Sequence, residues 1–341
     1  MVRRNVTIYD LAKESGSSAT TVAAVMNGTW RQRRVAEKTV LHVQAIATKM
    51  GYRANLQARG LRTSKSRMIG MIIPLHDNRY FSSLAEHFEH EARKRELCPV
   101  VVSTLRDPEE EKRTVATLIS HNIDQLFIAG ATKPDVLGEM CSKAGIAHIN
   151  VDLPGAQCKS VISDNYWGAS QLTRHLATSL PKPTTSKGAD IYFVGGIATD
   201  YNTKQRVKAF RDVIKSLGYK TPSSDHIDAC GYGAGKAEAA TAKLFERLGR
   251  APAAIFVNST IAFEGVFRYL KSRADSEITS MAVGCYDWDP FLSHLHFPVA
   301  MVRQNAKAMI EKAFQLMDSG EYLESGIIQI QPELFFPQHK H

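Results

Sequence analysis

The chain has 341 residues, of which 44% are hydrophobic and 23% charged, and its formal net charge is +9. This length predicts two or three compact units with a substantial core, and the composition excludes a disordered chain. The apolar runs are far shorter than the ~20 residues that cross a bilayer, and no apolar export signal follows the N-terminus. We therefore expect a cytoplasmic protein without a membrane partner.

Residues 7–27 predict two short helices joined by a tight turn. Apolar residues recur at helical spacing on both sides of Gly16, which permits the positive φ of a turn. These residues are Ile8, Leu11 and Ala12 before the turn and Val22, Val25 and Met26 after it. Such a pair either presents its second helix to a DNA major groove or packs as an ordinary helical hairpin, and the spacing alone fits both.

The positive charge is concentrated around this helical pair. Residues 1–65 hold twelve Lys or Arg residues against three acidic ones, whereas residues 66–341 are balanced. A basic segment attached to a neutral body is typical of a module that binds nucleic-acid phosphates. The charge therefore favours DNA binding over a basic surface that is only solvated.

The next segment, residues 28–34 (GTWRQRR), predicts a loop, and residues 35–50 predict a third helix with one apolar stripe. In one interpretation, Trp30 and its neighbouring arginines lie along a DNA backbone. In the other, Trp30 covers the three-helix core and the arginines are exposed to water. Both interpretations stay open at this point.

Residues 7–27 and 51–62 together resemble the N-terminal signature of the lactose-repressor (LacI/GalR) family of bacterial transcription regulators. That signature is T-I-x-D-V-A-x-x-A-G-V-S-x-x-T-V-S-x-x-L-N followed by Y-x-P-N-x-x-A-R-x-L. The chain matches it at Thr7, Ile8, Asp10, Ala12, Gly16, Ser18, Thr21, Val22, Asn27, Tyr52, Asn55, Ala58, Arg59 and Leu61. It departs from it at Ala23, Ala24 and Ala54, which replace a phosphate-contacting Ser, a base-reading Arg or His, and a hinge Pro.

The resemblance implies a DNA-binding surface on the second helix, the following loop and a hinge helix. Ala24 offers no bidentate guanine contact, so we expect a thymine methyl contact and a hydroxyl contact from Thr20 instead. The expected DNA-binding residues are Thr7, Ser18, Ala19, Thr20, Thr21, Ala24, Asn27, Trp30, Arg31, Arg33, Tyr52, Asn55, Ala58 and Leu61. Leu61 is expected to be an apolar wedge in the minor groove.

From Met68 onward, short apolar strands alternate with helices, which predicts parallel sheets covered on both faces. The strands are expected at 68–73, 100–104, 125–129, 147–151, 191–194, 253–257, 281–284 and 299–302. Helices are expected at 81–95, 109–120, 167–177, 204–217, 236–248 and 306–317. So many units favour two doubly wound halves over one sheet.

The expected fold is thus a small all-α helix-turn-helix domain joined to an α/β, periplasmic-binding-protein-like (type I) clamshell of two doubly wound parallel-sheet subdomains. The resemblance implies three crossovers, near Ser163, His294 and Tyr322. The expected domains are 1–52 for DNA binding, 53–66 for the hinge helix and linker, and 67–341 for effector binding and dimerisation. Within the last, the N-subdomain spans about 67–163 plus 295–322, and the C-subdomain about 164–294 plus 323–341.

Ligands bind doubly wound sheets beside the carboxyl ends of the strands, so the residues after each strand are candidates for an effector site. Arg206, Asp287 and Gln304 also match effector contacts of the family. The full set is Asn78, Tyr80, Phe81, Asp152, Asp200, Asn202, Arg206, Asn258, Ser259, Asp287, Trp288 and Gln304. For Tyr80, Phe81 and Trp288 core packing is the alternative, and for Arg206 and Asp287 it is a surface ion pair.

Catalytic signatures are weak. Residues 231–236 (GYGAGK) lack the G-x-x-x-x-G-K-[ST] spacing of a phosphate loop, and the sequence contains no G-x-S-x-G or H-E-x-x-H motif. The five cysteines are scattered without a C-x-x-C pair, which predicts reduced thiols and no metal site. We expect no enzyme activity and no cofactor.

The sequence therefore predicts a transcription regulator, and specifically a repressor. It is expected to bind a near-palindromic operator in double-stranded DNA as a homodimer and to respond to a small ligand, a sugar or sugar phosphate. The alternative is a cytoplasmic sugar-binding or sugar-metabolising protein without specific DNA binding.

Overall fold

The computed structural model describes residues 6–52, 65–181 and 188–337. The chain divides into two compact units, Met1–Ser66 and Arg67–His341. Within the described ranges, no helix is long and apolar enough to cross a membrane.

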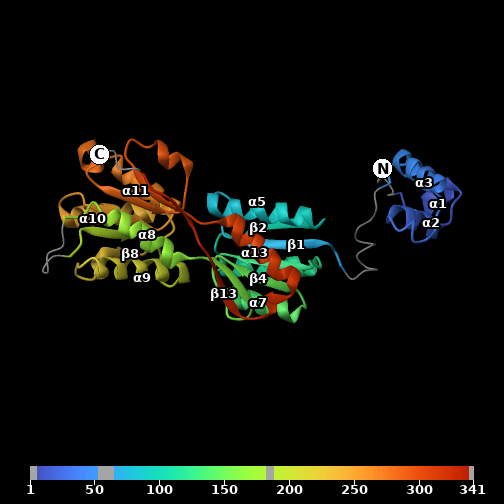
Figure 1. Cartoon of the computed structure of the whole chain (residues 1–341), viewed down its shortest axis with the longest axis horizontal. Helices are drawn as coiled ribbons and strands as arrows, with labels where there is room; N and C mark the ends of the chain where they lie inside the picture. Colours follow the sequence, from blue (N-terminus) through green and yellow to red (C-terminus); the bar gives the residue numbers. More distant parts are fainter. Residues whose placement is uncertain (1–5, 53–64, 182–187, 338–341) are drawn as a thin grey trace. The chain divides into compact units, whose positions relative to one another are not determined.

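The N-terminal unit contains three helices, α1 (Ile8–Ser15), α2 (Ala19–Met26) and α3 (Glu37–Lys49) (Figure 1). Thr7 and Asp10 form a capping box at the start of α1, and Gly16 ends this helix with φ 63°. The Ser18 side chain accepts a hydrogen bond from the Thr21 amide and so starts α2. The helices bury a small apolar core of Leu11, Val22, Val25, Val40, Val43 and Ala47.

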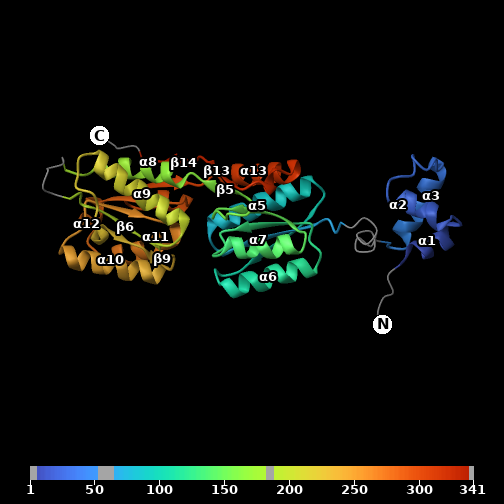
Figure 2. The same cartoon turned by 90° about the horizontal axis from the view of Figure 1, so that it is seen from below.

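The second unit begins with a six-stranded parallel sheet, which we call the sheet of the first lobe. Its strands, in spatial order, are β2 (Cys98–Ser103), β1 (Met68–Ile73), β3 (Gln125–Ala129), β4 (Ala147–Val151), β5 (Lys159–Ser163) and β13 (Gly326–Ile330). Two pairs of helices cover its faces (Figure 2): α5 (Arg79–Lys94) with α13 (Ala306–Ser319), and α6 (Pro108–Ser120) with α7 (Pro134–Lys143).

The sheet of the second lobe repeats this strand order and has one antiparallel edge strand. Its strands are β8 (Ile227–Asp228), β6 (Ile191–Val194), β10 (Ala254–Val257), β11 (Ala282–Tyr286), β12 (Val299–Arg303) and the antiparallel β14 (Glu333–Phe335). The faces are covered by α10 (Ala234–Leu248) with α11 (Thr260–Leu270), and by α8 (Asn165–Ala177) with α9 (Tyr201–Ser216). Smaller elements are β7 (Gly196–Ile197), β9 (Cys230–Gly231), α12 (Asp275–Thr279) and the 3-10 turns η1 (Ser224–His226), η2 (Pro290–His294) and η3 (Glu321–Leu323).

Two of the three crossovers between the lobes differ from the expected positions. The chain leaves the first lobe after β5, as expected near Ser163, but it returns only between β12 and α13 and crosses again between β13 and β14. The expected crossovers near His294 and Tyr322 are therefore wrong. β12 pairs with β11 of the second lobe and β13 with β5 of the first, and strand patterns do not reveal which sheet a strand joins.

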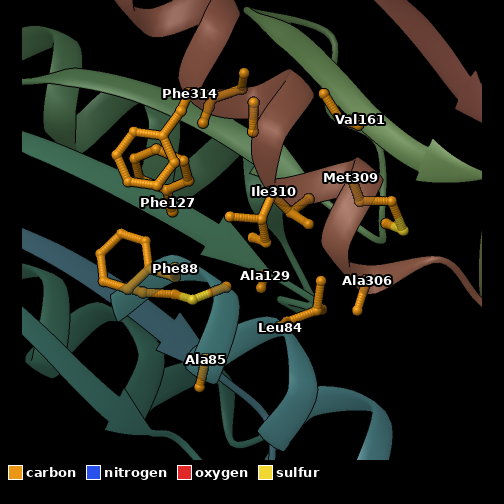
Figure 3. Packing of buried hydrophobic residues seen from close by; sticks show 14 of the residues in the cluster. Leu84, Ala85, Phe88, Phe127, Ala129, Val161, Ala306, Met309, Ile310 and Phe314 are labelled. Carbon is orange, nitrogen blue, oxygen red and sulfur yellow. The ribbon is translucent and has the colours of Figure 1, made fainter. Parts of the chain in front are cut away.

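The core of the first lobe joins segments that are far apart in the sequence (Figure 3). Phe88 of α5 and Phe314 of α13 both pack on Phe127 of β3, with ring centroids 5.0 and 4.6 Å from it. All three rings are fully buried. This packing fixes α13 on the first lobe although the strand before it, β12, belongs to the second.

Gly265 of α11 packs directly against the backbone of α10. A Cβ atom at this position would lie 1.9 Å from the carbonyl oxygen of Ala234. We therefore expect Gly265→Ala to destabilise the protein by about 3 kcal/mol in urea unfolding, because two helix backbones must separate. Gly235→Ala in α10 is the matched control: a Cβ there meets nothing within 4 Å, so it should be neutral or stabilising by about 0.5–1 kcal/mol. Equal effects of the two substitutions would contradict this packing.

Candidate functional site

A cavity of about 50 Å³ lies between the two lobes of the second unit. Many of the residues that line it follow strands of the two sheets, as expected for doubly wound folds. Its lining consists of Leu75, Asn78, Tyr80, Phe81, Arg106, Asp152, Asn202, Arg206, Tyr232, Ser259, Ile261, Asp287 and Gln304.

Three charged residues of this lining have backbone conformations that are unusual for residues other than glycine. The φ angles are 56° at Arg106, 72° at Asp152 and 115° at Asp287. Asp152 and Asp287 directly follow β4 and β11, one in each lobe. Backbone conformations of this kind are costly and are more frequent at functional sites than elsewhere.

Arg206 of α9 is a buried cation, with only 3% of its surface exposed. Its Nε donates to Oδ1 of Asn165 at 2.8 Å, and its Nη1 donates to the carbonyl oxygen of Asn258 at 2.7 Å. The guanidinium carbon also lies 3.6 Å from the centre of the Tyr286 ring. These contacts replace the lost hydration and hold the guanidinium in one orientation.

Asp152 connects the two lobes. Its Oδ1 accepts hydrogen bonds from the Tyr80 hydroxyl at 3.1 Å and from Nδ2 of Asn202, in the second lobe, at 3.0 Å. Asn202 in turn accepts from Asn165 at 2.9 Å. Burial raises the pKa of Asp152 above its ordinary value, so the closed cavity disfavours the ionised form of this carboxyl.

Asp287 lies on the second lobe and accepts a hydrogen bond from Nε2 of Gln304 at 2.7 Å. Burial raises its pKa to about 6, and the nearby Arg206 opposes part of that rise. The expected alternative, a surface ion pair between Arg206 and Asp287, is wrong because both side chains are buried.

The structure also assigns to the cavity four side chains that the sequence interpretation missed, the apolar Leu75 and Ile261 and the polar Arg106 and Tyr232. Arg106 of the first lobe lies 3.5 Å from Oδ2 of Asp200 and 4.5 Å from the centre of the Tyr232 ring, both in the second lobe. Arg106 follows an ordinary strand, and Tyr232 lies in a glycine-rich stretch considered only as a phosphate loop. Their position after β2 and after β9 was the signal available in the sequence.

Most of the expected effector residues meet in the cavity. Those that line it are Asn78, Tyr80, Phe81, Asp152, Asn202, Arg206, Ser259, Asp287 and Gln304. Tyr80 and Phe81 fit both the ligand-contact and the core-packing interpretation, since they line the cavity and also belong to the apolar core of the first lobe. The side chains of Asn78 and Ser259 additionally cap α5 and α11.

Three expected effector residues lie outside the lining. Asp200 pairs with Arg106, and Asn258 accepts from Arg206 through its carbonyl oxygen. Trp288 lines a neighbouring cavity, where the Arg303 guanidinium lies 4.7 Å from its ring centre. Asp200 and Asn258 therefore hold Arg106 and Arg206 in position from outside the lining.

In the N-terminal unit, the expected DNA-binding residues differ in accessibility. Ser18 and Thr20 are exposed, while Ala19, Thr21 and Asn27 are partly exposed. Ala24 is only 6% exposed, and its carbonyl accepts the Thr29 amide at 3.0 Å. The Ala24 side chain is thus largely covered within the N-terminal unit, and its expected contact with DNA stays a prediction.

The loop after α2 holds a tryptophan against the helical core and leaves its arginines outside. Trp30 packs on the core of the unit, and the Arg31 guanidinium lies 5.0 Å from its ring centre. Arg31 and Arg33 are exposed, and Tyr52 also packs on the core. Thr7 caps α1, and the expected DNA contacts Asn55, Ala58 and Leu61 lie outside the described residues.

A helix-turn-helix unit followed by a two-lobed α/β unit with a buried polar cavity defines a ligand-responsive DNA-binding regulator. Residues 69–291 match the model of the periplasmic binding protein domain, and residues 7–55 match that of the bacterial regulatory proteins of the lacI family. The chain belongs to this lacI family of transcription regulators.

Individual relatives agree with this assignment. The ribitol operon repressor of Klebsiella aerogenes is 45% identical over 193 residues, which cover 57% of this chain and 71% of the repressor. A crystal structure of the lac repressor dimer bound to operator and an anti-inducer aligns with a TM-score of 0.81 at 18% identity over 97% of this chain and 98% of that one. The Cra regulator of Pseudomonas putida, crystallised with fructose 1-phosphate, aligns with a TM-score of 0.69 at 22% identity over 79% and 98%. At these identities the two structures support the fold alone.

The raised pKa of Asp287 predicts a pH-dependent stability. The folded-state pKa of about 6 exceeds the ordinary 3.8, so between these pH values the folded state binds more protons than the unfolded state. The free energy of unfolding therefore decreases as the pH rises from about 4 to about 6. In urea unfolding, Asp287→Asn should remove a decline of up to about 3 kcal/mol over this range.

The exposed Asp275 of the same lobe provides the control. Asp275→Asn should retain the decline of the natural chain. An unchanged pH profile in Asp287→Asn would show that burial does not hold this carboxyl in its protonated form.

Proposed function

We propose that this regulator is a repressor that binds a near-palindromic operator as a homodimer. We further propose that a sugar or sugar phosphate, bound between the lobes, changes its affinity for DNA. The observation that carries the ligand-binding part is the buried cavity in which Asp152, Arg206 and Asp287 converge from both lobes. Charged and amide side chains in a cleft are the groups that orient a polyhydroxylated ligand.

The DNA-binding part of the proposal rests on the exposed start of α2 and on the basic loop that follows it. Ser18 and Thr20 are available for hydrogen bonds to DNA, and Arg31 and Arg33 for phosphate contacts. The 45% identical relative represses a ribitol operon by its name, which supports repression of a related class of genes here. A homodimer would place two such helices in half-sites about one helical turn apart.

The ligand-dependent part of the proposal requires a change in the cleft. The cavity of about 50 Å³ is smaller than the ~300 Å³ at which ordinary ligand pockets begin. A sugar-sized ligand would therefore enter a more open form and replace contacts such as Asn202 to Asp152. Because a ligand shifts an equilibrium only through unequal affinity for the two forms, we expect a coupling of about 1–3 kcal/mol between ligand and operator.

The proposal predicts protection of a near-palindromic sequence in DNase footprinting of the promoter region of the gene for this protein. Specific affinity should exceed that for random DNA of equal length at the same salt by at least ~1,000-fold. Absent protection, or equal protection of both DNAs, would instead favour a sugar-binding protein without specific DNA binding.

The cavity predicts a separation of DNA binding from ligand response. Asp287→Ala should lose the response of operator affinity to sugars and sugar phosphates, since it removes a buried acceptor, and should keep ligand-free operator affinity within about twofold. Fluorescence anisotropy with labelled operator measures both quantities. Asp275→Ala, at an exposed position of the same lobe, should retain both. A full response in Asp287→Ala would remove this residue from the effector site.

A further inference from the structure

The charged side chains of the cavity indicate which ligands it accepts. Among the described residues, the lining contains two cations, Arg106 and Arg206, and two carboxylates, Asp152 and Asp287. Asp200, which pairs with Arg106, adds a third carboxylate next to the lining. A ligand between the lobes therefore meets at least as many negative as positive groups.

Both cations already have protein partners. Arg206 uses Nε and Nη1 for Asn165 and Asn258 and stacks on Tyr286 at 3.6 Å. Arg106 pairs with Asp200 and stacks on Tyr232. A phosphate group needs cations or free amides with matching geometry, and here it would share the guanidinium groups of Arg106 and Arg206 with these protein partners.

Two of the helix N-termini at the cavity, those of α5 and α11, are capped by side chains. The amides of Tyr80 and Phe81 at the start of α5 donate to Oδ1 of Asn78 at 2.9 and 3.3 Å. The Ala262 amide at the start of α11 donates to Oγ of Ser259 at 3.2 Å. α9 begins after Asp200, whose side chain makes no capping hydrogen bond and instead pairs with Arg106. The usual backbone site for a phosphate is thus partly filled at α5 and at α11.

The carboxylates, by contrast, retain unused acceptor capacity. Among the described residues, hydrogen bonds reach only Oδ1 of Asp152, from Tyr80 and Asn202, and only Oδ1 of Asp287, from Gln304. The Oε1 atom of Gln304 is buried without a hydrogen-bond partner. A carboxylate accepts up to about four hydrogen bonds, so the cavity lacks donors, and ligand hydroxyl groups are donors.

We infer that the effector is an uncharged polyol or sugar and that the cavity rejects phosphorylated forms of the same carbon skeleton. This inference rests on the proposed function and narrows its ligand class. Hydroxyl groups donate to the free oxygens of Asp152 and Asp287. A phosphate dianion at the same place faces two buried carboxylates without a free counter-charge, and like charges in a site of low dielectric repel strongly.

The test compares matched neutral and phosphorylated ligands by isothermal titration calorimetry at pH 7.5 with the full chain. The pairs are ribitol and ribitol 5-phosphate, D-ribulose and D-ribulose 5-phosphate, and D-fructose and D-fructose 1-phosphate. We expect one neutral compound to bind best and its phosphorylated partner to bind roughly 100-fold more weakly. A phosphorylated compound that binds as tightly as its neutral partner, or a panel without a neutral binder, overturns the inference.

A charge-removing variant tests the cause of the selectivity. Asp287→Asn retains the shape of the side chain and removes one negative charge, so the preference for the neutral partner should fall by roughly tenfold. Asp275→Asn, which changes the same charge at an exposed position, should keep the preference of the natural chain. An unchanged preference in Asp287→Asn overturns the electrostatic explanation.

Operator binding, measured on the same samples, separates this inference from the proposed function. Specific operator binding that responds to a phosphorylated sugar overturns the inference and leaves the repressor function intact. Binding of a neutral polyol without any specific operator binding supports the ligand class and overturns the repressor function.

Discussion

The buried guanidinium of Arg206 is the constraint on which the architecture of the ligand-binding unit depends. A charge that is removed from water must receive hydrogen bonds or an opposite charge, because an uncompensated one would cost several kcal/mol. Here α8 supplies Asn165, the end of β10 is followed by Asn258, and β11 supplies the Tyr286 ring. Three separate segments must therefore be correctly placed before α9 can bury this residue.

Hydrogen bonds connect the same guanidinium to Asp152 of the first lobe. Asn165 accepts from Arg206 and donates to Asn202, and Asn202 donates to Asp152 of the first lobe. One connected set of hydrogen bonds thus reaches from the centre of the second lobe across the cleft. A ligand that replaces the Asn202 contact acts on this whole set, which gives a physical route from ligand binding to movement of the lobes.

The backbone strain at the cleft results from directing charged side chains into the cavity. Asp152 and Asp287 follow buried strands and must turn sharply to direct a carboxylate into the cavity, which places their φ angles at 72° and 115°. Packing of the lobes on both sides keeps these conformations in place.

The sequence by itself determined most strands of the two sheets and the class of protein. The apolar stretch 68–73 forms a strand that is buried because helices cover both faces of its sheet. The expected bounds of β1, β3, β4 and β6 agree with the structure. Residues after these strands also identified most of the cavity lining, because parallel strands all end at the same edge of a sheet. The lacI family followed from the resemblance of residues 7–27 and 51–62 to the family signature.

Only the tertiary structure decided which sheet receives each of the last strands, because pairing depends on contacts between segments far apart in the chain. Residues 299–303 and 326–330 both form parallel strands, yet they join different lobes. Burial of Ala24 was likewise not visible in the sequence, since it results from the way α2 packs in its own unit. The role of Arg106 also required the fold: only the approach of the second lobe brings Asp200 and Tyr232 to its guanidinium.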